Sequence, residues 1–119
     1  MRRYRVRAAA GVTLDLDLIE EYLVQTYQGL GDDTESAMRR AAGRIGEALL
    51  YIRTFVEHPH RGTIHPEIGA GIRTVTENRF IFYFQIDEAL FEVRILAVFF
   101  GGIDHRTQIV QRLKSSPIP

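Results

Sequence analysis

The stretch Arg79-Phe-Ile-Phe-Tyr-Phe-Gln-Ile86, followed by Asp87-Glu-Ala-Leu90 and then Phe91-Glu-Val-Arg-Ile-Leu-Ala-Val-Phe-Phe100, decides the fold of this chain. The first segment is apolar at consecutive positions, which is typical of a strand covered on both faces. The last segment alternates, and it predicts a strand with Glu92 and Arg94 on one face. Its other face would carry Phe91, Val93, Ile95, Ala97 and Phe99. The short polar segment between them predicts an antiparallel hairpin.

Two further strands are expected outside this hairpin. Residues 72–76 are expected to form one strand, which the turn residues Glu77-Asn78 join to the hairpin. Residues 4–8 alternate, which predicts a first strand near the N-terminus.

Two helices are expected between the first strand and the others. The first helix is expected to begin with Thr13 or Asp15 as its N-terminal cap. The residues on its expected buried face have helical spacing: Leu18, Ile19, Tyr22, Leu23, Thr26 and Tyr27. Residues 29–33 stop it, and a second helix is expected over 34–56. So short a connection predicts an antiparallel helical hairpin. We expect small residues of the second helix to let the two approach closely: Ala41, Ala42, Gly43 and Gly46.

The order β-α-α-β-β-β-(α) predicts an α+β fold, with the helical hairpin packed on a small, mainly antiparallel sheet. The final helix is expected over 104–113. A length of 119 residues fits one domain over 1–119, with 113–119 as a loose tail.

The zero net charge conceals a segregation of charge along the chain. Residues 1–14 carry four arginines and no acid, whereas residues 15–35 carry seven acids and no base. Lys114 is the only lysine among 15 basic residues. This bias reflects either genome-wide codon usage or the suitability of arginine for carboxylates and phosphates.

Several functional classes are disfavoured by composition. The chain has no cysteine, which excludes disulfides and thiolate metal sites and fits a reducing cytosol. No apolar stretch approaches the roughly 18–20 residues of a membrane span. The N-terminal arginines are not followed by a signal-peptide apolar segment. We therefore expect a cytoplasmic protein without membrane contact.

Three histidines, His58, His60 and His65, fall within eight residues of the loop before the last three strands. Imidazole suits zinc, nickel or copper, but these histidines lack the i, i+4 spacing of a helical metal site. We interpret them as solvated loop residues and expect neither a metal nor a cofactor.

Arginines are spread over the predicted sheet. Arg73, Arg79 and Arg94 fall on three consecutive strands, and Arg106 follows the last one. If they share a face, they form an anion site for RNA phosphate or partner carboxylates. The alternative pairs Arg94 with Glu92 or Glu77 and leaves the others solvated. Near such a cluster, His105 and Tyr83 are suited to proton transfer.

The third feature is an excess of phenylalanine on the strands, which two helices alone would leave undercovered. An exposed face of this kind marks a partner site, and a partner strand could also extend the sheet at the first strand. The alternative is that the C-terminal helix covers the face. The candidate partner-binding residues are Arg5, Arg7, Phe82, Phe84, Phe99 and Phe100.

A set of ordered motifs over residues 4–113 resembles the RelE/ParE superfamily of bacterial type II toxins. These are Tyr4-Arg-Val-Arg7, an acidic then apolar first helix, His58-Pro59-x-x-Gly62, Gly71-x-Arg73, Arg79-x-x-x-Tyr83, Val93-Arg-Ile-Leu96 and Phe100-Gly101-Gly102-x-Asp104-His105. The resemblance implies a sheet cradling a helical hairpin, and a cognate antitoxin that wraps around and neutralises the toxin. It also implies that the complex binds operator DNA through the antitoxin.

The resemblance implies one of two targets. RelE-like members cut messenger RNA on the ribosome without metal, whereas ParE-like members inhibit DNA gyrase by binding. Carried over by position, the nuclease reading assigns catalysis to Arg73, Arg79, Arg94, His105 and Arg106. The strands contain no lysine, unlike the nuclease pattern, and the hairpin is long, so we favour a non-enzymatic gyrase inhibitor. A purely structural relative, and a homodimer in the absence of antitoxin, stay open as alternatives.

Overall fold

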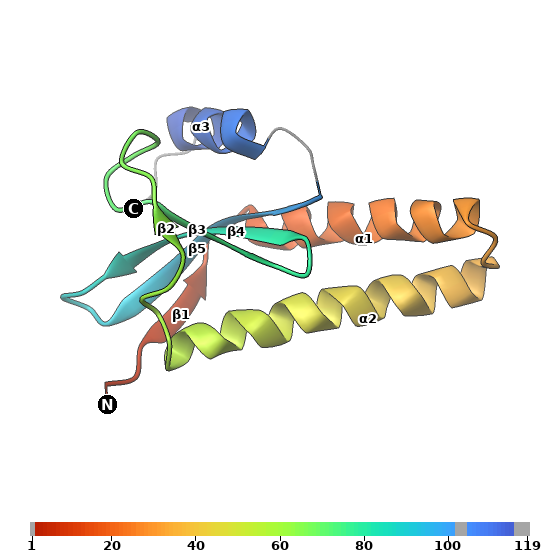
Figure 1. The fold of residues 1–119 in the computed structure, drawn as a ribbon, viewed down its shortest axis with the longest axis horizontal. Helices are drawn as coiled ribbons and strands as arrows, with labels where there is room; N and C mark the ends of the chain where they lie inside the picture. The colour runs from red at the N-terminus through yellow and green to blue at the C-terminus, as the bar shows by residue number, and fades with distance from the viewer. Residues whose placement is uncertain (1, 102–104, 116–119) are drawn as a thin grey trace.

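A five-stranded mixed sheet in the order β1-β5-β4-β3-β2 forms the centre of the computed structural model, which describes residues 2–101 and 105–115 (Figure 1). The elements in chain order are β1 (Arg5–Ala8), α1 (Val12–Gly29), α2 (Thr34–Arg53), the 3₁₀ turn η1 (Thr54–Val56), β2 (Thr63–Ile64), β3 (Arg73–Glu77), β4 (Phe80–Asp87), β5 (Glu92–Phe100) and α3 (His105–Ser115). The predicted α+β class and element order are confirmed. The structure adds β2, a two-residue strand in the expected loop.

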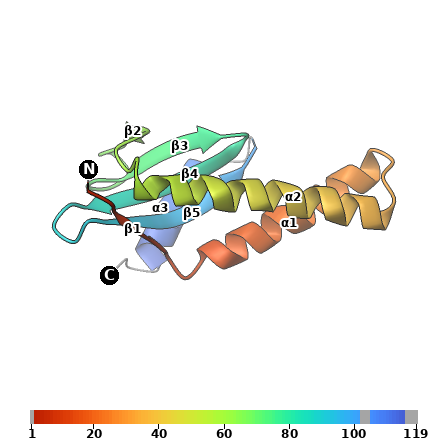
Figure 2. The same ribbon diagram turned by 90° about the horizontal axis from the view of Figure 1, so that it is seen from below.

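The sheet lies between two helical layers. The α1–α2 hairpin covers one face, and α3 lies on the opposite face (Figure 1). Figure 2 shows that α2 is the outermost element on the hairpin side and that the hairpin extends beyond the sheet. Strand β1 pairs with β5 in parallel, while the other pairs are antiparallel. A parallel pair needs a long connection, and here the helical hairpin and three strands separate β1 from β5 along the chain.

A bulge in β5 breaks the alternation expected from the sequence. Tyr83 pairs with Ala97 but the next residue, Phe84, pairs with Ile95, so Leu96 is an extra residue. Val93, Ile95, Val98 and Phe100 therefore pack toward the hairpin, whereas Leu96, Ala97 and Phe99 pack toward α3. The prediction that Phe91 through Phe99 share one face is wrong beyond Ile95.

The first helix also differs from its predicted pattern. It begins at Val12, three residues before Asp15, so neither Thr13 nor Asp15 is its cap. Its buried residues are Val12, Asp15, Leu16, Ile19 and Leu23. Leu18 and Tyr22, expected on the apolar face, are more than half exposed. Asp33, by contrast, caps α2 by accepting a hydrogen bond from the Ser36 N–H at 2.8 Å.

The close approach of the two helices depends on alanines of α2. Ala37, Ala41 and Ala48 are buried. A Cβ added at Gly43 or Gly46 would meet no atom within 4 Å, so these glycines do not contact α1. The expectation that all four small residues line the helix–helix contact is therefore correct only for Ala41.

Candidate functional site

Helix α3 covers part of the sheet with a second apolar core. Ile109 of α3 is fully buried against Ile81 and Tyr83 of β4 and Phe99 of β5. The alternative in which the C-terminal helix covers the phenylalanine-rich sheet is therefore correct. The expected first helical residue, Asp104, lies outside the described residues, and the helix continues to Ser115, beyond the expected 113.

The phenylalanines proposed for partner binding lie in the core. Phe82 and Phe84 are fully buried beneath the hairpin, which excludes them as a free surface in this conformation. Phe99 and Phe100 are 5% and 6% exposed, and each contributes to the wall of a cavity. The prediction of an undercovered sheet face is therefore wrong for Phe82 and Phe84.

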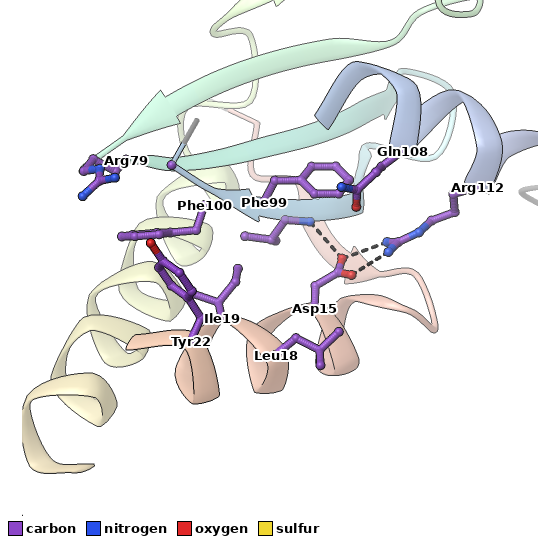
Figure 3. A pocket seen from close by; sticks show the side chains of 11 residues that line it. Asp15, Leu18, Ile19, Tyr22, Arg79, Phe99, Phe100, Gln108 and Arg112 are labelled. Atoms are coloured by element: carbon purple, nitrogen blue, oxygen red, sulfur yellow. Dashed lines mark hydrogen bonds and ion pairs between the residues drawn. The ribbon is translucent and has the colours of Figure 1, made fainter. Parts of the chain in front are cut away.

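An ion pair joins α1 to α3 at one end of this cavity (Figure 3). The Arg112 guanidinium donates to both carboxylate oxygens of Asp15, at 2.5 and 2.8 Å. The Val98 N–H donates to Asp15 Oδ2 at 3.0 Å. These bonds satisfy a buried carboxylate, and the hydrogen bonds to Asp15 raise the pKa of Arg112. From the sequence, Asp15 is one of two candidate caps of the helix, although its position four and eight residues before Ile19 and Leu23 indicates the buried face.

The cavity has a volume of about 390 Å³ and opens between α1, the end of β5 and α3. Its apolar wall includes Leu18, Ile19 and Tyr22 of α1 together with Phe99 and Phe100. Arg79 and Arg112 lie at opposite ends in Figure 3. The Arg79 guanidinium carbon lies 5.0 Å from the centre of the Phe100 ring, within cation–π range.

Polar side chains gather at the N-terminal end of α3. The Tyr83 hydroxyl and His105 Nδ1 are hydrogen-bonded at 2.7 Å. Arg106 donates to Glu67 at 2.8 Å, and that carboxylate also contacts His65 Nδ1 at 3.2 Å. These contacts, chiefly the hydrogen bond from Arg106, lower the pKa of Glu67 to about 2. These contacts connect the loop after β2 to α3. Glu67 is not among the residues singled out from the sequence.

The strand arginines do not share one face. Arg73 is opposite Phe84 in the β3–β4 register, which places it on the hairpin face, and it donates to the Arg61 carbonyl at 3.2 Å. Arg94 is on the other face, where its Nε donates to Glu92 at 2.9 Å and its Nη2 to Asp87 at 3.3 Å. Arg79 is in the turn before β4. The expected pairing of Arg94 with Glu92 is confirmed, while the shared anion site is wrong for Arg73 and Arg94.

A charge cluster marks the β1 edge of the sheet. Arg5 and Arg7 are exposed, and each lies within 3.7 Å of the buried Glu92 carboxylate on the neighbouring β5. Glu92 accepts its closest hydrogen bond from Arg94. Because β1 is the terminal strand of the sheet order, one side of its backbone has no neighbouring strand within the described part of the chain. Arg5 and Arg7 therefore flank an accessible sheet edge.

Two of the loop histidines, His60 and His65, have individual side-chain partners. His60 Nε2 lies 2.9 Å from Glu88, and His65 Nε2 lies 2.8 Å from the Thr74 hydroxyl. Within residues 2–101 and 105–115, no group of three or more His, Cys, Asp or Glu side chains is placed to hold a metal ion. In the same part of the chain, no helix has the length and apolarity needed to cross a membrane.

The architecture thus defines a small α+β class in which a sheet separates a helical hairpin from a C-terminal helix. No family model matches the sequence, and no curated protein matches it. A solved chain of the chromosomal ParDE TA system from P. aeruginosa is similar, with a TM-score of 0.65 and 17% identity over 84% of this chain and 98% of that one. A chain of the toxin–antitoxin complex RelBE2 from Mycobacterium tuberculosis has a TM-score of 0.56 and 14% identity over 83% and 99%. The chain therefore shares the fold of these two solved chains, which agrees with the fold that the sequence resemblance implies.

Proposed function

We propose that this chain is the toxin of a type II toxin–antitoxin system, that it acts in the cytoplasm by binding, and that DNA gyrase is its target. Support for a toxin comes from the likeness to chains of the ParDE system and the RelBE2 complex. Support for a binding mechanism comes from the dispersal of the candidate catalytic groups, which is the observation that carries the proposal.

A phosphoryl-transfer site needs a base and positive charge converging on one phosphate. Here Arg73 lies on the hairpin face and Arg94 on the opposite face. Arg94 is held by two carboxylates, and Arg106 by Glu67. In this conformation Arg94 and Arg106 are committed to structural contacts, which favours inhibition by binding over catalysis.

The antitoxin is expected to use the β1 edge and its arginines. A partner strand placed beside β1 would gain backbone hydrogen bonds, and acidic side chains on it would face Arg5 and Arg7. The antitoxin would also link the complex to operator DNA. This assignment keeps Arg5 and Arg7 as partner-binding residues and replaces the buried Phe82 and Phe84 by the open sheet edge.

The test is a supercoiling assay with purified gyrase and the full chain, made by cell-free synthesis to avoid growth arrest. Loss of supercoiling at stoichiometric toxin, restored by antitoxin, is the expected result. Undisturbed supercoiling at excess toxin would overturn the gyrase assignment. Harmless expression in cells together with that outcome would favour a relative that only binds its partner.

A second candidate function, metal-independent cleavage of messenger RNA on the ribosome, is favoured by one observation. The hydrogen bond between the Tyr83 hydroxyl and His105 places two proton-transfer groups beside Arg106. Primer extension on ribosome-bound transcripts would then show cuts that disappear in Arg106→Ala and His105→Ala. Intact transcripts during growth arrest would exclude this function.

A further inference from the structure

The outward face of α2 presents large apolar side chains to solvent. Ala37, Ala41 and Ala48 face inward, so the opposite face of the helix points away from the molecule. Met38, Leu49 and Leu50 are 55%, 47% and 62% exposed. Figure 2 shows this helix as the outer layer of the hairpin. Single exposed apolar residues are ordinary, but a group of three on one helix face indicates an interaction surface.

The centre of the same face carries only small side chains, so it is recessed relative to the ends of the face. Ala42 and Gly43 are exposed, and a Cβ at Gly43 or Gly46 would touch nothing within 4 Å. Glycine inside a helix carries a free-energy cost relative to alanine. No contact among the described residues offsets that cost. These small residues would let a second helix approach α2 closely, because the distance between two helix axes depends on the size of the side chains at the contact.

Opposite charges lie at the two ends of this face. Glu35, Ala42, Gly46 and Arg53 follow one another at intervals of seven, four and seven residues, which places them in one line along the helix. Glu35 has only an exposed contact with Arg39, at 3.7 Å. Arg53 has no ion pair or side-chain hydrogen bond within the described part of the chain. The intervals between these four residues are the same when read from either end of the line. The residue at one end is negatively charged and the residue at the other end is positively charged.

We propose that α2 pairs with α2 of a second copy of this chain in an antiparallel, two-fold symmetric contact. Glu35 then lies opposite Arg53 of the second copy, and Arg53 opposite its Glu35. The same register places Ala42 opposite Gly46 at the centre, where the helices come closest.

The apolar residues agree with this register. Met38 and Leu49 lie on the same flank of the line, so the antiparallel pairing sets Met38 of each copy beside Leu49 of the other. A parallel pairing would instead place Glu35 beside Glu35 and Arg53 beside Arg53. The face is thus complementary to itself in one orientation, which selects a second copy over an unrelated helix.

Analytical ultracentrifugation of the full chain tests the contact. The wild-type protein should sediment at twice the monomer mass of 13.6 kDa at high concentration and dissociate on dilution. Glu35→Arg and Arg53→Glu should each raise the dissociation constant at least tenfold, because like charges then face each other. The double exchange Glu35→Arg/Arg53→Glu should restore the dimer. A monomeric wild type at every concentration, or single exchanges without effect, would overturn the proposal.

Cross-linking tests the register, since the chain has no natural cysteine. Ala42→Cys and Gly46→Cys are made as separate proteins with different tags, mixed, and oxidised. The antiparallel register predicts predominantly mixed disulfide dimers, whereas a parallel contact predicts dimers of each variant with itself. Gln25→Cys, on an exposed part of α1, is the matched control and should stay monomeric. Equal cross-linking of all three variants would indicate random collision and contradict the proposed contact.

Discussion

Asp15 and Arg112, which are 97 positions apart in the sequence, form a two-pronged ion pair that fastens α3 to α1 across the edge of the sheet. The Asp15 side chain is 6% exposed and that of Arg112 is 29% exposed. The pair closes one end of the cavity and ties α3 to α1, in addition to the apolar contacts of Ile109.

Removing Arg112 should destabilise the fold. Arg112→Leu leaves the Asp15 carboxylate buried with only the Val98 N–H as donor, and such a loss costs about 2–3 kcal/mol of unfolding free energy. Urea denaturation followed by circular dichroism measures it. The matched control on the same helix is Arg106→Leu, whose pair with Glu67 is about half exposed and should contribute clearly less to the unfolding free energy. Equal losses in both variants would contradict the assignment.

Glu67 should give the protein a pH-dependent stability. Its folded-state pKa of about 2 is below the ordinary value of 4.5, so the unfolded chain binds the proton more readily. The contribution is complete above pH 4.5 and is lost as pH falls toward 2. The stability difference between wild type and Glu67→Gln should therefore shrink over this window. A difference that stays constant between neutral pH and pH 2 would disprove the linkage.

The origin of this shift has its own test. Arg106→Gln removes the largest cause, the hydrogen bond to Glu67, and should raise the pKa of that carboxyl toward its ordinary value. Carbon-detected NMR titration of the Glu67 carboxyl measures the change. An unchanged midpoint would assign the shift to the backbone and His65 instead.

Gly62 should be sensitive to substitution for a conformational reason. Its φ is +77°, and an added Cβ would overlap the Thr74 carbonyl oxygen of β3. Gly62→Ala should cost more than about 2 kcal/mol and detach β2 from β3. Gly29→Ala, at the end of α1 with nothing near its Cβ, should be neutral or stabilising by up to about 1 kcal/mol. Thermal unfolding distinguishes them, and a tolerated Gly62→Ala would show that the loop can move.

Local patterns predicted the strands and helices well, because both a continuous apolar run and helical spacing depend only on residues that are close in the sequence. The apolar run of β4 and the turn after it identified the central hairpin. Strand β2 was missed, since a two-residue strand is defined only by its pairing with distant Thr74 and Arg73.

Side-chain placement was harder to predict for the same reason. One extra residue, Leu96, moved Ala97 and Phe99 to the face opposite Ile95. The partner of Asp15 depends on where α3 packs, which no local spacing encodes. The two faces of Arg73 and Arg94 likewise follow from strand register, which sequence analysis had left undecided.

The proposed antitoxin edge makes a final prediction. Arg5→Gln/Arg7→Gln should weaken binding of the cognate antitoxin about tenfold or more, mainly at low salt, because acidic residues beside β1 would lose their counter-charges. Glutamine is chosen over glutamate because it removes the positive charge without placing a new carboxylate beside the buried Glu92. Glu92 keeps its hydrogen bond from Arg94. The control Arg39→Gln/Arg40→Gln removes the same charge from the start of α2, away from β1, and should change antitoxin affinity little (Figure 1). Isothermal titration at two salt concentrations measures both. Equal affinity for wild type and the β1 variant would place the antitoxin elsewhere on the toxin.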